Sequence, residues 1–313
     1  MAIPRSTPLF QAWMRPAFLL LAALLLSACS PRMLLLKGVA DGLSNQEQGS
    51  AEDDLQLARE ASAYHLKLSE AVLKQTPEHL GLAESVAAGF TQYAYAFVAQ
   101  SADELANRDA RAAQRQRERA ARLYWRARQH AMQALELRHP GFASALAAAA
   151  PAGPVTTPLT AQGVLNLAPD ELGLAYWAAA SWGAHIALSK DQPDKVADLP
   201  QVVALAQLAW QRQPDFAEGS LSSLRGTLEA ARPGGSRAEA EALFERAIQV
   251  GGKRNAGIWV ARAEALALPA GDRVRFEAWL HEALAVSRSR PDLANQVMQV
   301  RAQWLLDSVE DLF

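Results

Sequence analysis

The segment AEALFERA, residues 240–247, carries the clearest helix-packing pattern of the chain. Its Ala240, Phe244 and Ala247 follow one another at intervals of four and three residues, so the three side chains share one face of a helix. A large ring between two alanines leaves room for a neighbouring helix to approach closely. The segment therefore predicts a helix that packs tightly against another helix.

Weaker versions of this pattern of small and large residues occur elsewhere, each shortly before a proline. They are Leu68/Ala71, Ala131/Ala134, Ala206/Ala209 and Leu280/Ala283. Counted between second alanines, and including Ala247, the last two intervals are 38 and 36 residues, close to the ~34 residues of a tetratricopeptide repeat (TPR). The first two, 63 and 75 residues, are near a doubled unit. We predict degenerate TPR hairpins with extra helices or loops; an Ala-rich bundle without repeats is the alternative.

Composition favours helices along the whole chain. The 313 residues are rich in Ala, Leu, Arg and Glu, all strong helix formers. We predict an all-α fold: helical hairpins of degenerate TPR type that form an α-α superhelix or bundle, in a single domain over residues 57–313. A proline-rich stretch near 148–168 predicts a loop insertion, after which a helix restarts at Pro169. Among the other helices, we expect a long one over 108–137 and six more at about 200–212, 216–231, 236–250, 255–267, 272–288 and 291–311.

The N-terminus carries a processing signal. Two arginines precede an uncharged run, Pro16–Leu26, that is shorter than the roughly 20 apolar residues of a membrane span. This arrangement is typical of a secretory signal peptide. The last four residues, Leu26-Ser27-Ala28-Cys29, resemble a bacterial lipobox. We predict a lipoprotein signal peptide over residues 1–28 and lipidation of Cys29.

Lipidation would hold the protein on a membrane without a span. In lipoprotein sorting, Ser30 after the cysteine favours the outer membrane over the inner membrane, which predicts a lipid-anchored periplasmic protein. Residues 29–56 begin apolar, with room for a short docking helix, and then become polar and glycine-containing. Such a segment buries little surface, so we predict a flexible tether there.

Charge and cysteine content exclude other classes. Without the signal peptide the net charge is about −4, whereas a general nucleic-acid binder shows a basic excess. We therefore expect no nucleic-acid partner. Cys29 is the only cysteine of the chain, so no intrachain disulfide can form in an oxidising compartment.

Sequence motifs for catalysis and cofactor binding are missing. The six histidines form no HExxH pattern, and neither a phosphate-binding loop nor a GxSxG elbow occurs. The cysteine is consumed by lipid. We therefore expect no catalytic residue, no metal, no cofactor and no enzymatic activity.

Two groups of aromatic residues are candidates for lining a ligand cavity. Phe90, Tyr93 and Phe97 stand at i, i+3 and i+7, which places them on one helical stripe. Trp177 and Trp182 lie in a second, alanine-rich segment beside Gly183. Each group serves either as packed core between helices or as the wall of a cavity for an apolar or amphipathic ligand.

The helix expected over 108–138 is strongly basic. It carries nine arginines against three acidic residues, in a chain that is acidic as a whole. A solvated face with ion pairs one turn apart is one interpretation. The alternative is an electrostatic patch for an acidic partner or for lipid headgroups.

Three stretches carry a more specific signal. They are GFTQYAYAFV (89–98) with ADEL (102–105), ALELRHPGF (134–142), and YWAAASWGA (176–184) with SKDQPDKVADLP (189–200). With them, the chain resembles the T component of tripartite ATP-independent periplasmic (TRAP) transporters, over nearly all of its mature length. The resemblance implies a fold of degenerate TPR hairpins, a homotrimer with a channel or cavity through each subunit, and association with a TRAP-type periplasmic solute-binding protein.

The expected function follows from this resemblance. It is a membrane-anchored, non-enzymatic accessory scaffold of a TRAP-type transport system. The scaffold docks the solute-binding protein and holds or conducts an apolar or organic-acid ligand through a cavity. The alternative is a TPR-type lipoprotein scaffold for outer-membrane, pilus or cell-wall assembly, because stacked helical repeats form concave peptide-binding surfaces.

Overall fold

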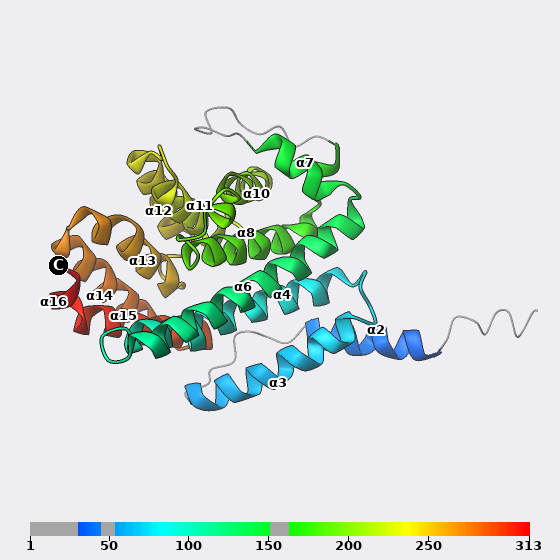
Figure 1. Cartoon of the computed structure of the whole chain (residues 1–313), viewed down its shortest axis with the longest axis horizontal. Helices are drawn as coiled ribbons and strands as arrows, with labels where there is room; N and C mark the ends of the chain where they lie inside the picture. The colour runs from blue at the N-terminus through cyan, green and yellow to red at the C-terminus, as the bar shows by residue number, and fades with distance from the viewer. Residues whose placement is uncertain (1–30, 45–53, 151–162) are drawn as a thin grey trace, which may run out of the picture.

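The fold is built from helices that pack side by side, as the computed structural model of the chain shows for residues 31–44, 54–150 and 163–313 (Figure 1). No strand forms within these residues, which confirms the predicted all-α fold. The α-helices are α2 (Pro31–Ser44), α3 (Leu55–Leu73), α4 (Leu80–Ala94), α5 (Gln100–Leu105), α6 (Ala110–Arg138), α7 (Phe142–Ala149), α8 (Leu172–Ala187), α9 (Pro193–Val196), α10 (Leu199–Arg212), α11 (Ser220–Ala231), α12 (Arg237–Gly251), α13 (Ala256–Arg262), α14 (Arg273–Ser289), α15 (Leu293–Asp307) and α16 (Val309–Leu312).

Short helical segments of other types connect them. Two are π-helical, η1 (Tyr95–Ala99) and η4 (Ala263–Ala267). Three are 3-10 turns, η2 (Gly163–Leu165), η3 (Pro169–Glu171) and η5 (Leu268–Ala270). The two π-helical segments directly continue α4 and α13, and η4 falls within the helix expected at about 255–267.

The long helix α6 is the spine of the molecule. It crosses the view in Figure 1 and packs on both α4 and α8. The largest core forms around these helices and α10, with buried side chains such as Leu82, Leu135, Leu174 and Leu205. A second core, which includes Phe276 and Leu280, holds α13, α14 and α15 together. The chain thus has two packed halves, joined by α11 and α12.

The segment AEALFERA lies in α12 and packs as its spacing predicts. Ala240, Phe244 and Ala247 are fully buried. The ring of Phe244 lies against Gly226 of α11, so closely that a Cβ added at Gly226 would come within 2.9 Å of it. Because α11 and α12 pack as neighbours in sequence and in space, they form the expected helical hairpin. That the hairpins are of TPR type stays a prediction.

The four weaker versions of the pattern differ in burial. The pairs Ala131/Ala134, Ala206/Ala209 and Leu280/Ala283 are buried. The pair in α3 is wrong as a core contact, because Leu68 is 40% exposed and Ala71 is exposed as well. The buried side of α3 instead carries Leu66, Leu73 and the charged Glu70.

Part of the segment predicted as a tether is the helix α2. It lies where a short docking helix had room to form, and it packs on α3 and α4 with Ala40 fully buried. The signal peptide 1–28, Cys29 and the polar stretch 45–53 lie outside the described residues. The tether and the lipid anchor stay predictions.

The connection near 148–168 begins and ends in ordered structure. α7 reaches Ala149, and Leu165 and Leu167 are buried in the main core. The expected helix restart is the turn Pro169–Glu171, which leads directly into α8. Residues 151–162 lie outside the described part.

Within the described ranges, no helix has both the length and the apolar character needed to cross a membrane.

Candidate functional site

The stripe of Phe90, Tyr93 and Phe97 is mostly core. Phe90 and Tyr93 are buried, and Phe90 stacks on His130 of α6 with ring centroids 6.1 Å apart. Phe97 is half-buried and meets Tyr93 edge to face at 5.5 Å. Phe97 also lines an open pocket.

That pocket is an open hollow of about 680 Å³ between α3, η1, α5 and α15. Its walls mix apolar and polar groups, and Phe97 forms part of them beside Val297, Gln100 and Glu104. A ligand role for Phe90, Tyr93 and Phe97 stays a prediction, and the geometry gives Phe97 the access that the other two rings lack.

The two tryptophans of α8 differ in their surroundings. Trp177 is half-buried and packs edge to face on Tyr176, with ring centroids 4.8 Å apart. Trp182 is 1% exposed, and its Nε1 donates a hydrogen bond to Asp198 at 3.3 Å. Trp182 therefore belongs to the core, and its ring meets an arginine of α6.

That arginine is Arg128, which lies between two indole rings. Its guanidinium carbon is 3.9 Å from the ring centroid of Trp182 and 4.4 Å from that of Trp125. Trp125 and Arg128 are one turn apart on α6, and Trp182 comes from α8, so packing of the two helices creates the arrangement. Contacts at these distances are favourable cation–π interactions. We call Trp125, Arg128 and Trp182 the arginine–indole cluster.

Arg128 has no anionic partner in the described part of the chain. Its Nε is buried without a hydrogen bond, and no ion pair to it is formed there. Burial lowers the pKa of the guanidinium from its ordinary value, and Asp198 opposes this effect from a distance. The charge is thus held by two aromatic faces instead of by a carboxylate.

Two further basic residues border the cluster. The Nζ of Lys195 lies 5.9 Å from the Trp125 ring centroid and is 3.1 Å from Asp194. His185, in turn, is buried beside Trp125, with ring centroids 5.1 Å apart. Its Nδ1 lies 2.9 Å from the carbonyl oxygen of Ala121, which can only accept a hydrogen bond, and its Nε2 is buried without a partner among the described residues. Burial lowers the pKa of His185, so the ring is neutral at pH 7.

A third feature is the junction between the two halves. Arg301 of α15 donates to Asp103 of α5 at 2.8 Å and to Glu264 of η4 at 2.5 Å. The hydroxyl of Tyr95, in η1, lies 3.9 Å from the sulfur of Met298. Both π-helical segments thus contact α15. Such segments are rare and are often found at functional sites, and the pocket beside Phe97 borders this junction.

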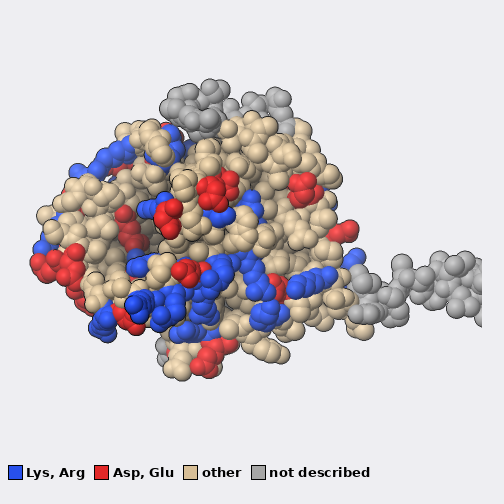
Figure 2. Space-filling view, in the orientation of Figure 1, with Lys and Arg blue, Asp and Glu red and all other residues tan. Residues whose placement is uncertain are grey.

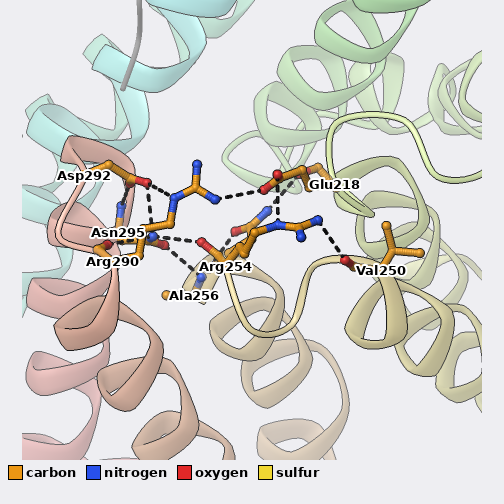
Figure 3. Close-up of polar contacts among 10 residues, drawn as sticks. Glu218, Val250, Arg254, Ala256, Arg290, Asp292 and Asn295 are labelled. Atoms are coloured by element: carbon orange, nitrogen blue, oxygen red, sulfur yellow. Dashed lines mark hydrogen bonds and ion pairs between the residues drawn. The ribbon is translucent and has the colours of Figure 1, made fainter. Parts of the chain in front are cut away.

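The polar network in Figure 3 holds the turns that precede α11, α13 and α15. Glu218 pairs with Arg254 at 3.0 Å and with Arg290 at 3.4 Å. Asn295, which is buried, accepts a hydrogen bond from the amide of Ala256 and donates to the carbonyl oxygens of Arg254 and Arg290. These groups satisfy one another, so the network fixes the stacking of successive helices.

The basic helix presents one exposed strip. Figure 2 shows lysine and arginine side chains gathered along the lower edge of the view, where α6 begins. Arg111, Arg115 and Arg122 are exposed, stand at helical intervals of four and seven residues, and form no ion pair within the described residues. Other arginines of α6 do have partners, as Arg126 has with Glu70. We call Arg111, Arg115 and Arg122 the basic strip.

Sequence reasoning missed the arginine–indole cluster. It counted Arg128 among the arginines of a solvated face and did not single out Trp125. The spacing of a tryptophan and an arginine at i and i+3 was the available signal. The second indole could not be found this way, because Trp182 lies 54 residues after Arg128 in the chain.

Among the described residues, no three His, Cys, Asp or Glu side chains come together in a way that could hold a metal ion.

His139, at the end of α6, contacts the buried Glu171, with 2.9 Å between its Nε2 and the carboxylate Oε1. Arg138 also pairs with Glu171. Glu171, through His139 and Arg138, therefore links the end of α6 to the turn that precedes α8.

Comparison with known proteins agrees with the sequence motifs. Residues 51–313 match the family described as TRAP transporter T-component. An uncharacterized protein of Treponema pallidum (strain Nichols) is 27% identical over 321 aligned positions, which cover 95% of this chain and 96% of that protein. Because the family match extends over most of the chain, from α3 to the last residue, the protein belongs to the TRAP transporter T-component family.

Proposed function

We propose that this accessory component of a TRAP transporter is a non-enzymatic scaffold that docks a periplasmic solute-binding protein. The single observation that carries the proposal is the family match over residues 51–313. The fold supports it, because a stack of packed helices offers large surfaces for a protein partner.

The basic strip is the docking surface that we infer. Its three arginines have no acidic partner within the described residues, although the mature chain as a whole is acidic. Exposed charges of one sign steer an oppositely charged partner and raise its association rate. The strip therefore fits an acidic face of the solute-binding protein.

The anchor belongs to the same proposal. The lipobox-like Leu26–Cys29 supports lipidation of Cys29 after removal of residues 1–28. Ser30 favours the periplasmic face of the outer membrane. Anchoring keeps the scaffold in the compartment where it meets a diffusing partner and raises the effective concentration of the pair.

The proposal also includes ligand binding and oligomeric assembly. We infer that the protein assembles as a homotrimer and holds or conducts an apolar or organic-acid ligand. The hollow beside Phe97 and the arginine–indole cluster are the two places whose side chains suit such a ligand.

A pull-down tests the docking. The lipidated chain, tagged at its C-terminus, is captured from gently solubilised envelopes, and its partners are identified by mass spectrometry. We expect a TRAP-type solute-binding protein as the main partner. The triple variant Arg111→Glu, Arg115→Glu, Arg122→Glu should lose it, whereas Arg288→Glu, an exposed arginine of α14, should retain it.

Other outcomes reject parts of the proposal. Capture of barrel-assembly, pilus or cell-wall components in place of a binding protein would assign the chain to envelope assembly. Retention of the binding protein by the triple variant would move the docking surface away from α6.

A further inference from the structure

We propose that the arginine–indole cluster binds the carboxylate group of an organic monoacid with an apolar body. The inference deepens the ligand-holding part of the proposed function and rests on it for its biological role. The binding itself is a property of this chain and can be measured alone.

Arg128 lacks a counter-charge. A buried or half-buried cation normally has a hydrogen-bonded anionic partner, because an unpaired charge away from water costs several kcal/mol. Other shielded arginines follow this rule: Arg232 pairs with Glu229, Arg262 with Glu245 and Arg301 with Asp103. Arg128 has no such partner in the described chain. The half-buried Arg119 lacks one too, but it lies near a single ring, whereas Arg128 lies between two indoles.

The placement of the two indoles favours a planar anion. Trp125 and Trp182 lie over the guanidinium with their centroids 4.4 Å and 3.9 Å from its central carbon. A guanidinium that is stacked on aromatic rings still points its N–H groups outward in its own plane, where they can donate hydrogen bonds. A carboxylate is the anion that matches this planar fork, since it can accept two parallel N–H bonds.

The charges around Arg128 limit the charge of the ligand. Besides Arg128, the nearby charges are Lys195, Asp194 and Asp198. Lys195 is already paired with Asp194, and Asp198 partly offsets Arg128 while it accepts the indole N–H of Trp182. These four charges sum to zero, so a ligand meets one guanidinium without an ion pair and no further surplus of positive charge. This suits a monocarboxylate better than a phosphate or a dicarboxylate.

The rings of the cluster suit an apolar ligand body. Trp125 is half-buried and Trp182 is buried, and the neutral ring of His185 packs on Trp125. Aromatic rings beside an ion-binding group contact apolar carbon well. The acid that fits thus carries an aliphatic or aromatic body next to its carboxylate.

The test uses 4-fluorophenylacetate with the purified full-length lipoprotein in detergent, followed by ¹⁹F NMR line broadening at pH 7.5. The neutral analogue 4-fluorophenylacetamide measures partition into detergent and apolar binding without charge. Inorganic phosphate, added in excess, measures displacement by a simple anion. We expect saturable binding of the carboxylate, little binding of the amide and weak competition by phosphate.

Variants locate the site. Arg128→Met should weaken carboxylate binding at least tenfold, and Arg128→Lys should weaken it less, because it keeps the charge and loses the fork. The matched control is Arg119→Met, since Arg119 is another half-buried arginine of α6 that forms no ion pair in the described chain and lies 6.0 Å from a single ring, that of Tyr93. It should bind like wild type. Circular dichroism and thermal unfolding of each variant verify the fold.

Three results would overturn the inference: no saturable binding by the wild type up to millimolar carboxylate, equal binding by folded Arg128→Met, or equal binding of the amide. Full displacement of the carboxylate by phosphate would show that the site binds anions in general, and so overturn the monocarboxylate as the ligand class.

The pull-down separates this inference from the proposed function. Carboxylate binding without a captured solute-binding protein removes only the docking, and capture without carboxylate binding removes only this site.

Discussion

The guanidinium of Arg301 donates a 2.8 Å hydrogen bond to Asp103, a residue 198 positions earlier in the chain. The same side chain donates to Glu264 in η4 and is only 12% exposed. One shielded cation between two carboxylates thus joins the N-terminal half to the C-terminal half, at the point where both π-helical segments contact α15.

Replacement of Arg301 should lower the free energy of unfolding, because it removes the contact between the two halves. Arg301→Met leaves Glu264 without its cation and leaves Asp103 with only Arg117, 4.0 Å away. The two carboxylates are 36% and 29% exposed, so water screens part of the lost attraction and the cost is about 1–3 kcal/mol. We expect a fall of roughly that size in the free energy of unfolding, measured by urea denaturation and circular dichroism. Arg111→Met, on the exposed face of α6, should change it by less than about 0.5 kcal/mol. Equal stability of the two variants would show that the junction does not depend on Arg301.

Acid should weaken the contact between α3 and α6. Glu70 has a side chain that is 4% exposed. Burial alone would raise its pKa, but hydrogen bonds from Arg126, Lys67 and His130 outweigh this and lower the pKa to about 2. Because the folded pKa lies below the ordinary 4.5, the charged carboxylate stabilises the fold, by about 3 kcal/mol. This stabilisation is complete above about pH 5 and is lost as the pH falls towards 2.

Unfolding measured at several pH values tests this dependence. Glu70→Gln should be clearly less stable than wild type at pH 7, and the difference should shrink between pH 5 and pH 2.5. Glu118→Gln, an exposed position of α6, is the control. A difference between wild type and Glu70→Gln that does not change with pH would contradict the assignment of a lowered pKa.

A glycine before α11 is required for two reasons. Gly219 has φ +83°, and a Cβ there would stand 2.7 Å from the carbonyl oxygen of Ala247. Gly234 has φ +70° but open space around it. A left-handed conformation costs a non-glycine residue about 1–2 kcal/mol, so Gly234→Ala should lose about that much. Gly219→Ala should lose clearly more, because it also pushes α12 away. Thermal unfolding of both variants tests this, and equal losses would mean that the backbone absorbs the clash.

The tryptophans of α8 should differ in their effect on stability. Trp182→Ala removes a fully buried ring that also donates to Asp198, and such truncations cost about 3–5 kcal/mol. Trp177→Ala removes a half-buried ring and should cost less. Chemical denaturation distinguishes the two. A Trp182→Ala variant as stable as wild type would show that this ring does not support the core.

Much of the fold was predictable because it depends on spacing along single helices. The interval of Ala240, Phe244 and Ala247 predicted a tightly packed helix, and these residues are fully buried in α12. The final helices lie close to the ranges expected for them, for example α14 (Arg273–Ser289) against 272–288. The exposed pair in α3 was beyond this reasoning, since two residues one turn apart can share either face of a helix.

The helical class, the family and the approximate helix boundaries could be predicted from residue order, because periodicity, helix propensity and local motifs act over a few residues. Which side chains meet across helices depends on the tertiary structure. It placed Trp182 over Arg128, Glu70 against Arg126, and Arg301 between Asp103 and Glu264. Each of these contacts joins residues far apart in the chain. Their pairing depends on how the helices pack, which the spacing within one helix does not encode.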